Sequence, residues 1–206
     1  MKDTRFAKLV LFINALVPLA LLLWDVYHKQ VGANPLEFAT RTTGMLTLLF
    51  LIVSLAVTPA RQITRLNWLI KFRRMLGLFA FFYGFLHLLT YILFDRYLNL
   101  KSIPGDIATR PFIAVGMLAF FLMVPLAITS TNKMVKRLGG KRWNQLHKLV
   151  YLTGVGGVVH YYMLVKSDTR IPLSFAFVLA VLLGYRIYAA NRTPKARVQS
   201  VVPPSS

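Results

Sequence analysis

The chain contains no cysteine, and only six of its 206 residues are aspartate or glutamate. Without cysteine, disulfides, iron–sulfur clusters and thiolate-ligated haem are all excluded. No glycine-rich phosphate-binding loop follows a strand pattern, and the segments between the apolar runs are too short for a soluble domain. A built-in nicotinamide or dinucleotide site is therefore not expected.

Positive charge and apolar residues are abundant instead. Lysine and arginine number 25, which gives a formal net charge of +19, and 56% of the residues are hydrophobic. In a soluble protein such a charge would indicate a nucleic-acid surface. Here the basic residues fall between long apolar runs and do not form one face of a helix. We therefore expect a protein of the lipid bilayer that binds no nucleic acid.

Six apolar runs follow one another at about residues 9–28, 42–59, 75–95, 111–131, 147–166 and 172–190. Each is close to the roughly 20 residues that a helix needs to cross a bilayer. Prolines inside the runs, such as Pro18 and Pro125, are tolerated in membrane helices. The expected fold is an all-α bundle of six transmembrane helices over residues 1–192, followed by a disordered tail at 193–206.

Charge in the connecting segments predicts the orientation. The amino terminus, the segments 60–74 and 132–148 and the carboxyl tail together hold 18 of the lysines and arginines, and the other three connections hold 7. The positive-inside rule then places both termini in the cytoplasm. The acidic residues show the reverse bias, since five of the six fall on the outer side: Asp25, Glu37, Asp95, Asp106 and Asp168.

Two histidines are expected at the same depth in the membrane. His87 lies twelve residues past the start of the third run, and His160 lies thirteen past His147 on a run that also starts inside. An ionisable residue inside a membrane marks a functional site by default, and neutral imidazole is a common ligand of haem iron. His87 and His160 could therefore ligate one iron from opposite sides. The alternative is that each is a satisfied polar residue packed between helices.

His147 lies roughly 20 Å from His160 along an ideal helix, at the inner edge of the membrane. Its neighbours are typical of an interfacial belt: Arg142, Trp143 and Lys148. At its depth the third run offers Arg73 and Arg74, which could hold propionates or phosphate-like groups. They could equally be ordinary positive charge of the inner side.

The thirteen-residue spacing leaves His147 and His160 on different faces of an ideal helix. Glycines lie between them and could permit close packing or irregular winding: Gly154, Gly156 and Gly157. Alternatively, the two histidines face different partner helices.

Several segments together resemble the ferric-reductase-like transmembrane family. They are the run RWNQLHKLVY around His147, the histidine thirteen residues later, GFLHLLTY around His87 and the six-run layout. Within that family, the chain is most similar to the haem-binding subunits of bacterial periplasmic methionine sulfoxide reductase systems. The resemblance covers essentially the whole chain outside the tail.

The resemblance implies that His87, His147 and His160 bind b-type haem, either one haem or two. With Arg73, Arg74 and Trp143 they form the predicted set of cofactor-binding residues. It also implies a bacterial inner membrane and electron flow from the quinone pool, or from a cytosolic flavin reductase, to a periplasmic molybdopterin methionine sulfoxide reductase. That flow would support repair of oxidised proteins, and FMN is implied as a further cofactor. The larger NADPH oxidases carry another histidine where this chain has Arg73 and Arg74, which argues against a second bis-histidine haem.

Two other function classes remain open. A small transporter that uses its histidines for protons or metal would favour carboxylates at mid-membrane, and the chain has none there. A passive anchor for a partner protein would need no buried histidine. If haem is bound, the chain could also be another haem b membrane anchor subunit of a respiratory complex. We expect an electron carrier without substrate chemistry of its own, and an optical spectrum separates the three classes.

Overall fold

The computed structural model describes residues 4–30, 32, 34–95 and 97–192, and every regular element in these ranges is a helix. The predicted tail at 193–206 lies outside the described residues. The main helices are α1 (Thr4–Tyr27), α2 (Pro35–Thr64), α3 (Ile70–Thr90), α4 (Ile103–Thr109), α5 (Pro111–Ile128), α6 (Asn132–Leu146), α7 (Leu149–Leu164) and α8 (Arg170–Arg192). Single turns complete the chain: 3₁₀ turns at Asn67–Leu69 and Leu100–Ser102, and a π turn at Tyr91–Asp95.

The all-α membrane fold is confirmed. Among the described residues, five helices are long and apolar enough to cross a bilayer, namely α1, α2, α3 with its extension, α5 and α8. The sixth, α7, is apolar but has only 16 residues. The chain is thus a multi-pass membrane protein. Pro18, Pro59 and Pro125 all lie inside membrane helices, as the sequence allowed.

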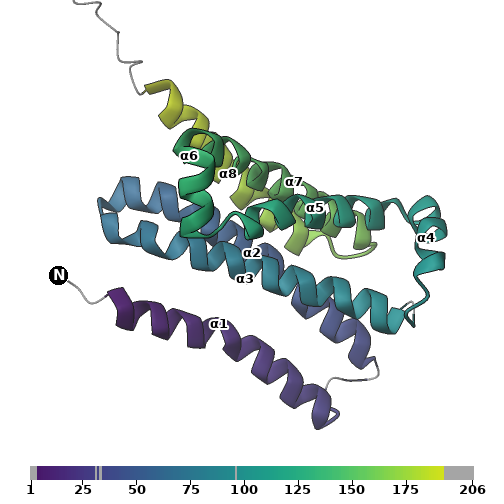
Figure 1. Ribbon diagram of the computed structural model, residues 1–206. Helices are drawn as coiled ribbons and strands as arrows, with labels where there is room; N and C mark the ends of the chain where they lie inside the picture. The colour runs from purple at the N-terminus through teal and green to yellow at the C-terminus, as the bar shows by residue number, and fades with distance from the viewer. Residues whose placement is uncertain (1–3, 31, 33, 96, 193–206) are drawn as a thin grey trace, which may run out of the picture.

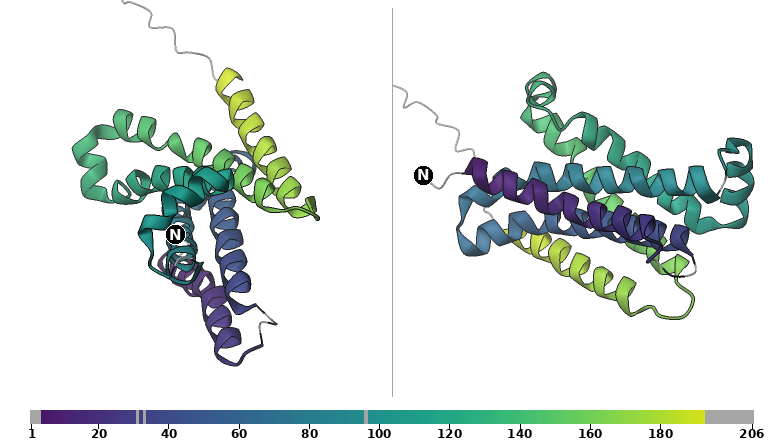
Figure 2. Two further views of the ribbon diagram at one scale, coloured as in Figure 1. Left: turned by 90° about the vertical axis from the view of Figure 1, so that its right-hand side faces the viewer. Right: turned by 90° about the horizontal axis from the view of Figure 1, so that it is seen from below.

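The helices form two antiparallel hairpins that face each other. One consists of α2 and α3, and the other of α5 and α7. Figure 1 shows that the start of α1, the α2–α3 turn, α6 and the end of α8 gather at one end of the bundle, which we call the inner end. The opposite end, with α4, is the outer end. Figure 2 places α1 and α8 on different sides of the two hairpins.

Helix α2 lies at the centre of the bundle. Its buried residues Leu48, Leu51, Ile52 and Leu55 form one cluster with residues of α3, α5, α7 and α8: Ala80, Met123, Val150, Val158 and Leu179. The peripheral helices are attached by hydrogen bonds to backbone carbonyls. The hydroxyl of Tyr83 donates to Ala15 of α1 over 2.6 Å, and Arg186 of α8 donates to Leu55 over 2.7 Å.

The extent of α2 differs from the predicted run 42–59, because a polar cap starts the helix well before the apolar residues. The side chain of Asn34 accepts a hydrogen bond from the backbone N–H of Glu37 over 3.1 Å, and Pro35 occupies the first turn. Both are strong helix-start signals. The helix continues to Thr64 and ends where Arg65 adopts a left-handed conformation, with φ of 58°.

The segment 132–148 was predicted as a connection, but it forms α6. Thr131 caps the helix by accepting from the backbone N–H of Met134 over 3.2 Å, and Gly139 kinks it with φ of 73°. Met134, Val135 and Leu138 are half-buried at helical spacing, while the basic residues between them are exposed. Hydropathy alone misses such a short amphipathic helix.

Glycines allow α7 to pack closely on its neighbours. A Cβ on Gly156 would lie 3.2 Å from that of Ala119 on α5, and one on Gly157 would lie 3.4 Å from Leu48 on α2. Of the two predicted roles of these glycines, close packing is therefore confirmed. His147 lies in the turn before α7 begins at Leu149, so it does not share a helix with His160. The predicted run 147–166 thus starts two residues too early.

We predict that the inner end faces the cytoplasm, because the basic residues concentrate there. Reporter fusions after Arg65 and Lys136 should then report the cytoplasm, and fusions after Lys101 and Lys166 the periplasm. Activity of paired phosphatase and fluorescent reporters measures this. An inverted signal at any of the four positions would contradict the orientation.

Candidate functional site

A cavity of about 590 Å³ lies between the two hairpins. Its walls come from α2, α3, α5 and α7, and its deeper part is lined by apolar residues such as Leu48, Leu51 and Met123. Its outer rim is polar. The volume falls in the range of pockets that hold small molecules and cofactors, and such pockets occur between the helices of bundles.

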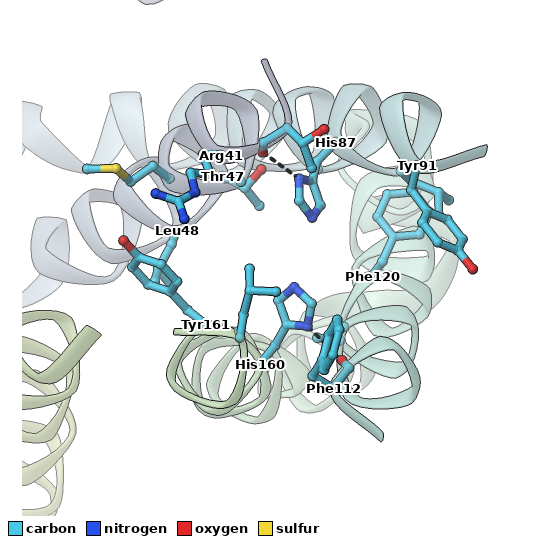
Figure 3. A pocket seen from close by; sticks show the side chains of 18 of the residues that line it. Arg41, Thr47, Leu48, His87, Tyr91, Phe112, Phe120, His160 and Tyr161 are labelled. Carbon is cyan, nitrogen blue, oxygen red and sulfur yellow. Dashed lines mark hydrogen bonds between the residues drawn. The ribbon is translucent and has the colours of Figure 1, made fainter. Parts of the chain in front are cut away.

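His87 and His160 face each other across this cavity. His87 comes from α3 and His160 from α7, and the centroids of their rings lie 6.1 Å apart with the ring planes at 79°. Figure 3 shows the two imidazoles pointing toward one another, with aromatic side chains such as Phe112 and Phe120 beside them. The structure therefore brings together the two histidines that were expected at the same depth in the membrane.

Each imidazole is oriented by a backbone carbonyl of a neighbouring helix. The Nδ1 atom of His87 lies 2.9 Å from the carbonyl oxygen of Thr40 on α2, and that of His160 lies 2.7 Å from the carbonyl oxygen of Phe112 on α5. A carbonyl only accepts, so each Nδ1 carries the proton. In the neutral imidazole the lone pair is then on Nε2, which Figure 3 shows directed into the cavity. Histidines that ligate metals are oriented in this way.

Two glycines make room for the rings. Gly44 lies one turn after Thr40 on α2, and Gly116 lies one turn after Phe112 on α5. A Cβ on Gly116 would be 2.7 Å from Nδ1 of His160, and one on Gly44 would be 3.1 Å from Nδ1 of His87. Both helices thus use the same arrangement, a carbonyl followed four residues later by a glycine. This arrangement was not predicted from the sequence, although single glycines inside apolar helices were a visible signal.

The spacing of the rings fits axial ligation of one iron. A metal–imidazole bond is about 2.0–2.1 Å long and the ring nitrogen lies about 1 Å from the ring centre, so two rings on opposite sides of one ion are about 6 Å apart. The observed separation is 6.1 Å. Among the described residues no group of three or more His, Cys, Asp or Glu could hold a bare metal ion. Two imidazoles alone would leave the other coordination positions of an iron to be filled by a bound group, as the macrocycle does in haem proteins.

His147 and Trp143 form a separate cluster at the inner end. Their rings stack with centroids 3.8 Å apart, and both bond to Thr129: Nε2 of His147 lies 3.0 Å from its hydroxyl, and Nε1 of Trp143 donates to its carbonyl over 2.9 Å. Arg74 donates to Asn132 over 2.6 Å. The pKa of His147 is lowered to about 4, first by burial and then by the positive charges of Arg73 and Arg74. None of these predicted residues lines the cavity.

The outer end of the cavity wall is tied together by a side-chain bond that the sequence did not reveal. The π turn Tyr91–Asp95 directly follows the helix that carries His87. The hydroxyl of Tyr91 donates to the carboxylate of Asp106 in α4 over 2.7 Å, and Asp106 is only 7% exposed. Irregular turns of this kind are frequent at functional sites, and here one connects the site to α4.

Comparison with known proteins gives consistent matches. Residues 40–158 match the family model described as "Ferric reductase like transmembrane component". Curated relatives cover nearly the whole chain. The chain is 52% identical to a protein of Ralstonia nicotianae over 91% of its own length and 87% of the relative's, and 51% identical to one of Herminiimonas arsenicoxydans over 89% and 85%. A protein of Caulobacter vibrioides is 44% identical over 94% and 91%.

All three relatives carry the name "Protein-methionine-sulfoxide reductase heme-binding subunit MsrQ". The regions aligned with these relatives are longer than the matched residues 40–158 and reach into α1 and α8. The family expected from the sequence is thus confirmed, and the chain belongs to the MsrQ family within the ferric-reductase-like transmembrane proteins.

Proposed function

We propose that this chain binds one b-type haem between His87 and His160 and carries electrons from the cytoplasmic to the periplasmic face of the bacterial inner membrane. The observation that supports this most directly is the pair of facing imidazoles, 6.1 Å apart, with both Nε2 atoms free to coordinate. Haem supplies one-electron redox chemistry, and the protein supplies its ligands and surroundings. A haem held without cysteine is not of the c type, because covalent attachment needs a Cys-x-x-Cys-His motif, and the proposal of b-type haem is consistent with this.

The chain's own residues have three tasks in this proposal. His87 and His160 supply the axial nitrogens, the carbonyls of Thr40 and Phe112 fix the tautomers, and apolar walls exclude water. The low polarity of the surroundings is one of the means by which a protein sets the redox potential of an iron. No side chain needs to act on a substrate, so we propose an electron-transfer subunit.

The names of the relatives support a proposal for the partner. They are called subunits of a protein-methionine-sulfoxide reductase, so we propose that the acceptor is the periplasmic molybdopterin reductase of that system. Its repair of oxidised methionines would consume the electrons. The donor would be the quinone pool or a cytosolic flavin reductase.

The inner cluster is the place where we propose that electrons arrive. It combines the stacked pair Trp143 and His147 with the guanidinium groups of Arg73 and Arg74. Such groups suit an anionic or aromatic cofactor, and FMN has both characters, with a phosphate and a flat ring system. A second haem at His147 has less support, because the imidazole bonds to Thr129 and no second histidine among the described residues is paired with it.

A proton or metal transporter is supported less well. Glu37 is the only acid among the described residues that line the cavity, and it lies at the outer rim. A proton path through the bundle would need further titratable groups at the depth of the histidines.

We predict that His87→Ala and His160→Ala each abolish most of the low-spin haem spectrum, because each removes one axial ligand. The double variant should look no worse than either single variant, since ligands that act as a unit are not additive. His147→Ala should keep the low-spin spectrum and slow reduction by a flavin reductase or a quinol analogue. Difference spectra after dithionite and stopped-flow reduction measure both effects. Full retention of the low-spin signal in His87→Ala would disprove the pairing, and a colourless wild-type preparation from haem-replete cells would disprove haem binding altogether.

We also predict that Gly116→Ala weakens haem binding, because the new methyl group meets the ring of His160, which its bond to Phe112 holds in place. An overlap of this kind costs on the order of 1–3 kcal/mol, which corresponds to roughly a five- to 150-fold loss of affinity. Gly44→Ala, with a contact of 3.1 Å, should have the smaller effect. Gly184→Ala on α8 is the matched control, since a Cβ there meets nothing within 4 Å. Haem-to-protein ratios of the three variants at equal expression give the comparison, and equal ratios would rule out the role of the glycines.

A further inference from the structure

Two arginines lie at the outer rim of the cavity. Arg41 and Arg110 are the only lysine or arginine residues among the described residues that line it. Both are exposed, and the side chain of Arg41 is 71% accessible and pairs with Glu37 over 3.0 Å. Figure 3 shows Arg41 on the α2 side of the cavity, on the same wall as Thr47 and Leu48.

The arginines are placed by the same segments that orient the histidines. Arg41 directly follows Thr40, whose carbonyl holds His87, and Arg110 precedes Phe112, whose carbonyl holds His160, by two residues. One arginine therefore comes from each hairpin. Both line the cavity that holds the histidine pair, Arg41 from α2 and Arg110 from the residue before α5.

Among the described residues that line the deeper part of the cavity, none is a lysine or arginine that could balance a negative charge. This part is lined by residues such as Leu48, Leu51, Ala119 and Met123. A carboxylate placed there would lose its hydration without a partner, which is very costly. Arg73 and Arg74, the cations that the sequence suggested for propionates, do not line this cavity.

We propose that Arg41 and Arg110 bind the two carboxylates of the haem, an inference that rests on the proposed haem site. Guanidinium groups form charge-assisted, often bidentate hydrogen bonds with carboxylates. The ion pair of Arg41 with Glu37 is exposed and therefore weak, so it can yield to a carboxylate at the rim. The carboxylates would then lie toward the outer end of the bundle, which is the periplasmic side in the proposed orientation.

The test compares natural haem with its dimethyl ester, which keeps the iron and the ring but lacks both negative charges. The full-length wild-type chain and Arg41→Gln, Arg110→Gln and double variants are produced without haem, loaded in membranes with either compound and solubilised. The rate of loss of the low-spin absorbance to excess apomyoglobin is then measured. Arg170→Gln is the matched control, because Arg170 is an outer-end arginine that does not line the cavity.

With natural haem, the double variant should lose the cofactor about tenfold faster or more, since a charge-assisted hydrogen bond contributes about the free energy of a tenfold change in binding. With the dimethyl ester, wild type and variants should lose it at the same rate. Lysine at either position should restore part of the retention, because it keeps the charge. Arg170→Gln should match wild type with both compounds.

Two results would overturn the inference. One is unchanged loss of natural haem in the double variant, and the other is equal acceleration with natural haem and ester, which would show that the arginines act on the protein and not on the carboxylates. If the double variant does not accumulate, the single variants are compared in the same way and must show the same dependence on the ester. Failure of the wild type to form a low-spin species with either compound would instead refute the proposed haem site.

Discussion

The hydrogen bonds from His87 and His160 to backbone carbonyls are the interactions on which the site depends. An imidazole on a membrane helix can rotate and can carry its proton on either nitrogen. The carbonyls of Thr40 and Phe112 remove both freedoms, because each accepts from one Nδ1 and leaves the opposite nitrogen directed into the cavity. The buried proton is satisfied and the lone pair is left for a ligand. The pairing of helices into two hairpins serves this geometry, since each histidine is held by the other helix of its own hairpin.

The two halves of the site are built alike. In each hairpin an outward-running helix carries the histidine, and its inward-running partner supplies a carbonyl, a glycine one turn later and an arginine near the rim. The ring of each histidine lies against a glycine and bonds to a carbonyl of the same helix, so main-chain atoms take part in setting its position. Main-chain atoms of a packed helix move less than long side chains do, and the 6.1 Å separation of the rings therefore belongs to the fold itself.

Much of this could be predicted from the sequence, and the rest could not for physical reasons. Apolar runs gave the six spans, and counting residues from the inner edge paired His87 with His160, because helices rise by a constant amount per residue. The depth of a residue in the membrane does not tell how its helix is rotated about its own axis, however. The carbonyls that orient the rings could therefore not be predicted. Every residue has such a carbonyl, and only packing selects Thr40 and Phe112. The helix α6 was missed because caps and amphipathic spacing, rather than hydropathy, determine it. The question of whether His147 and His160 share a face was settled by a turn at residues 147–148.

The cap at Asn34 has a consequence for how the protein can vary. It fixes where α2 begins, and Thr40 and Gly44 follow at set distances along the helix. Inserting or deleting one residue between the cap and Thr40 would turn that carbonyl by about 100° around the helix axis, away from His87, without changing the apolar character of the span. The first turns of α2 must therefore keep their register for the site to form, even though such a change would leave the length and composition of the membrane segment almost the same.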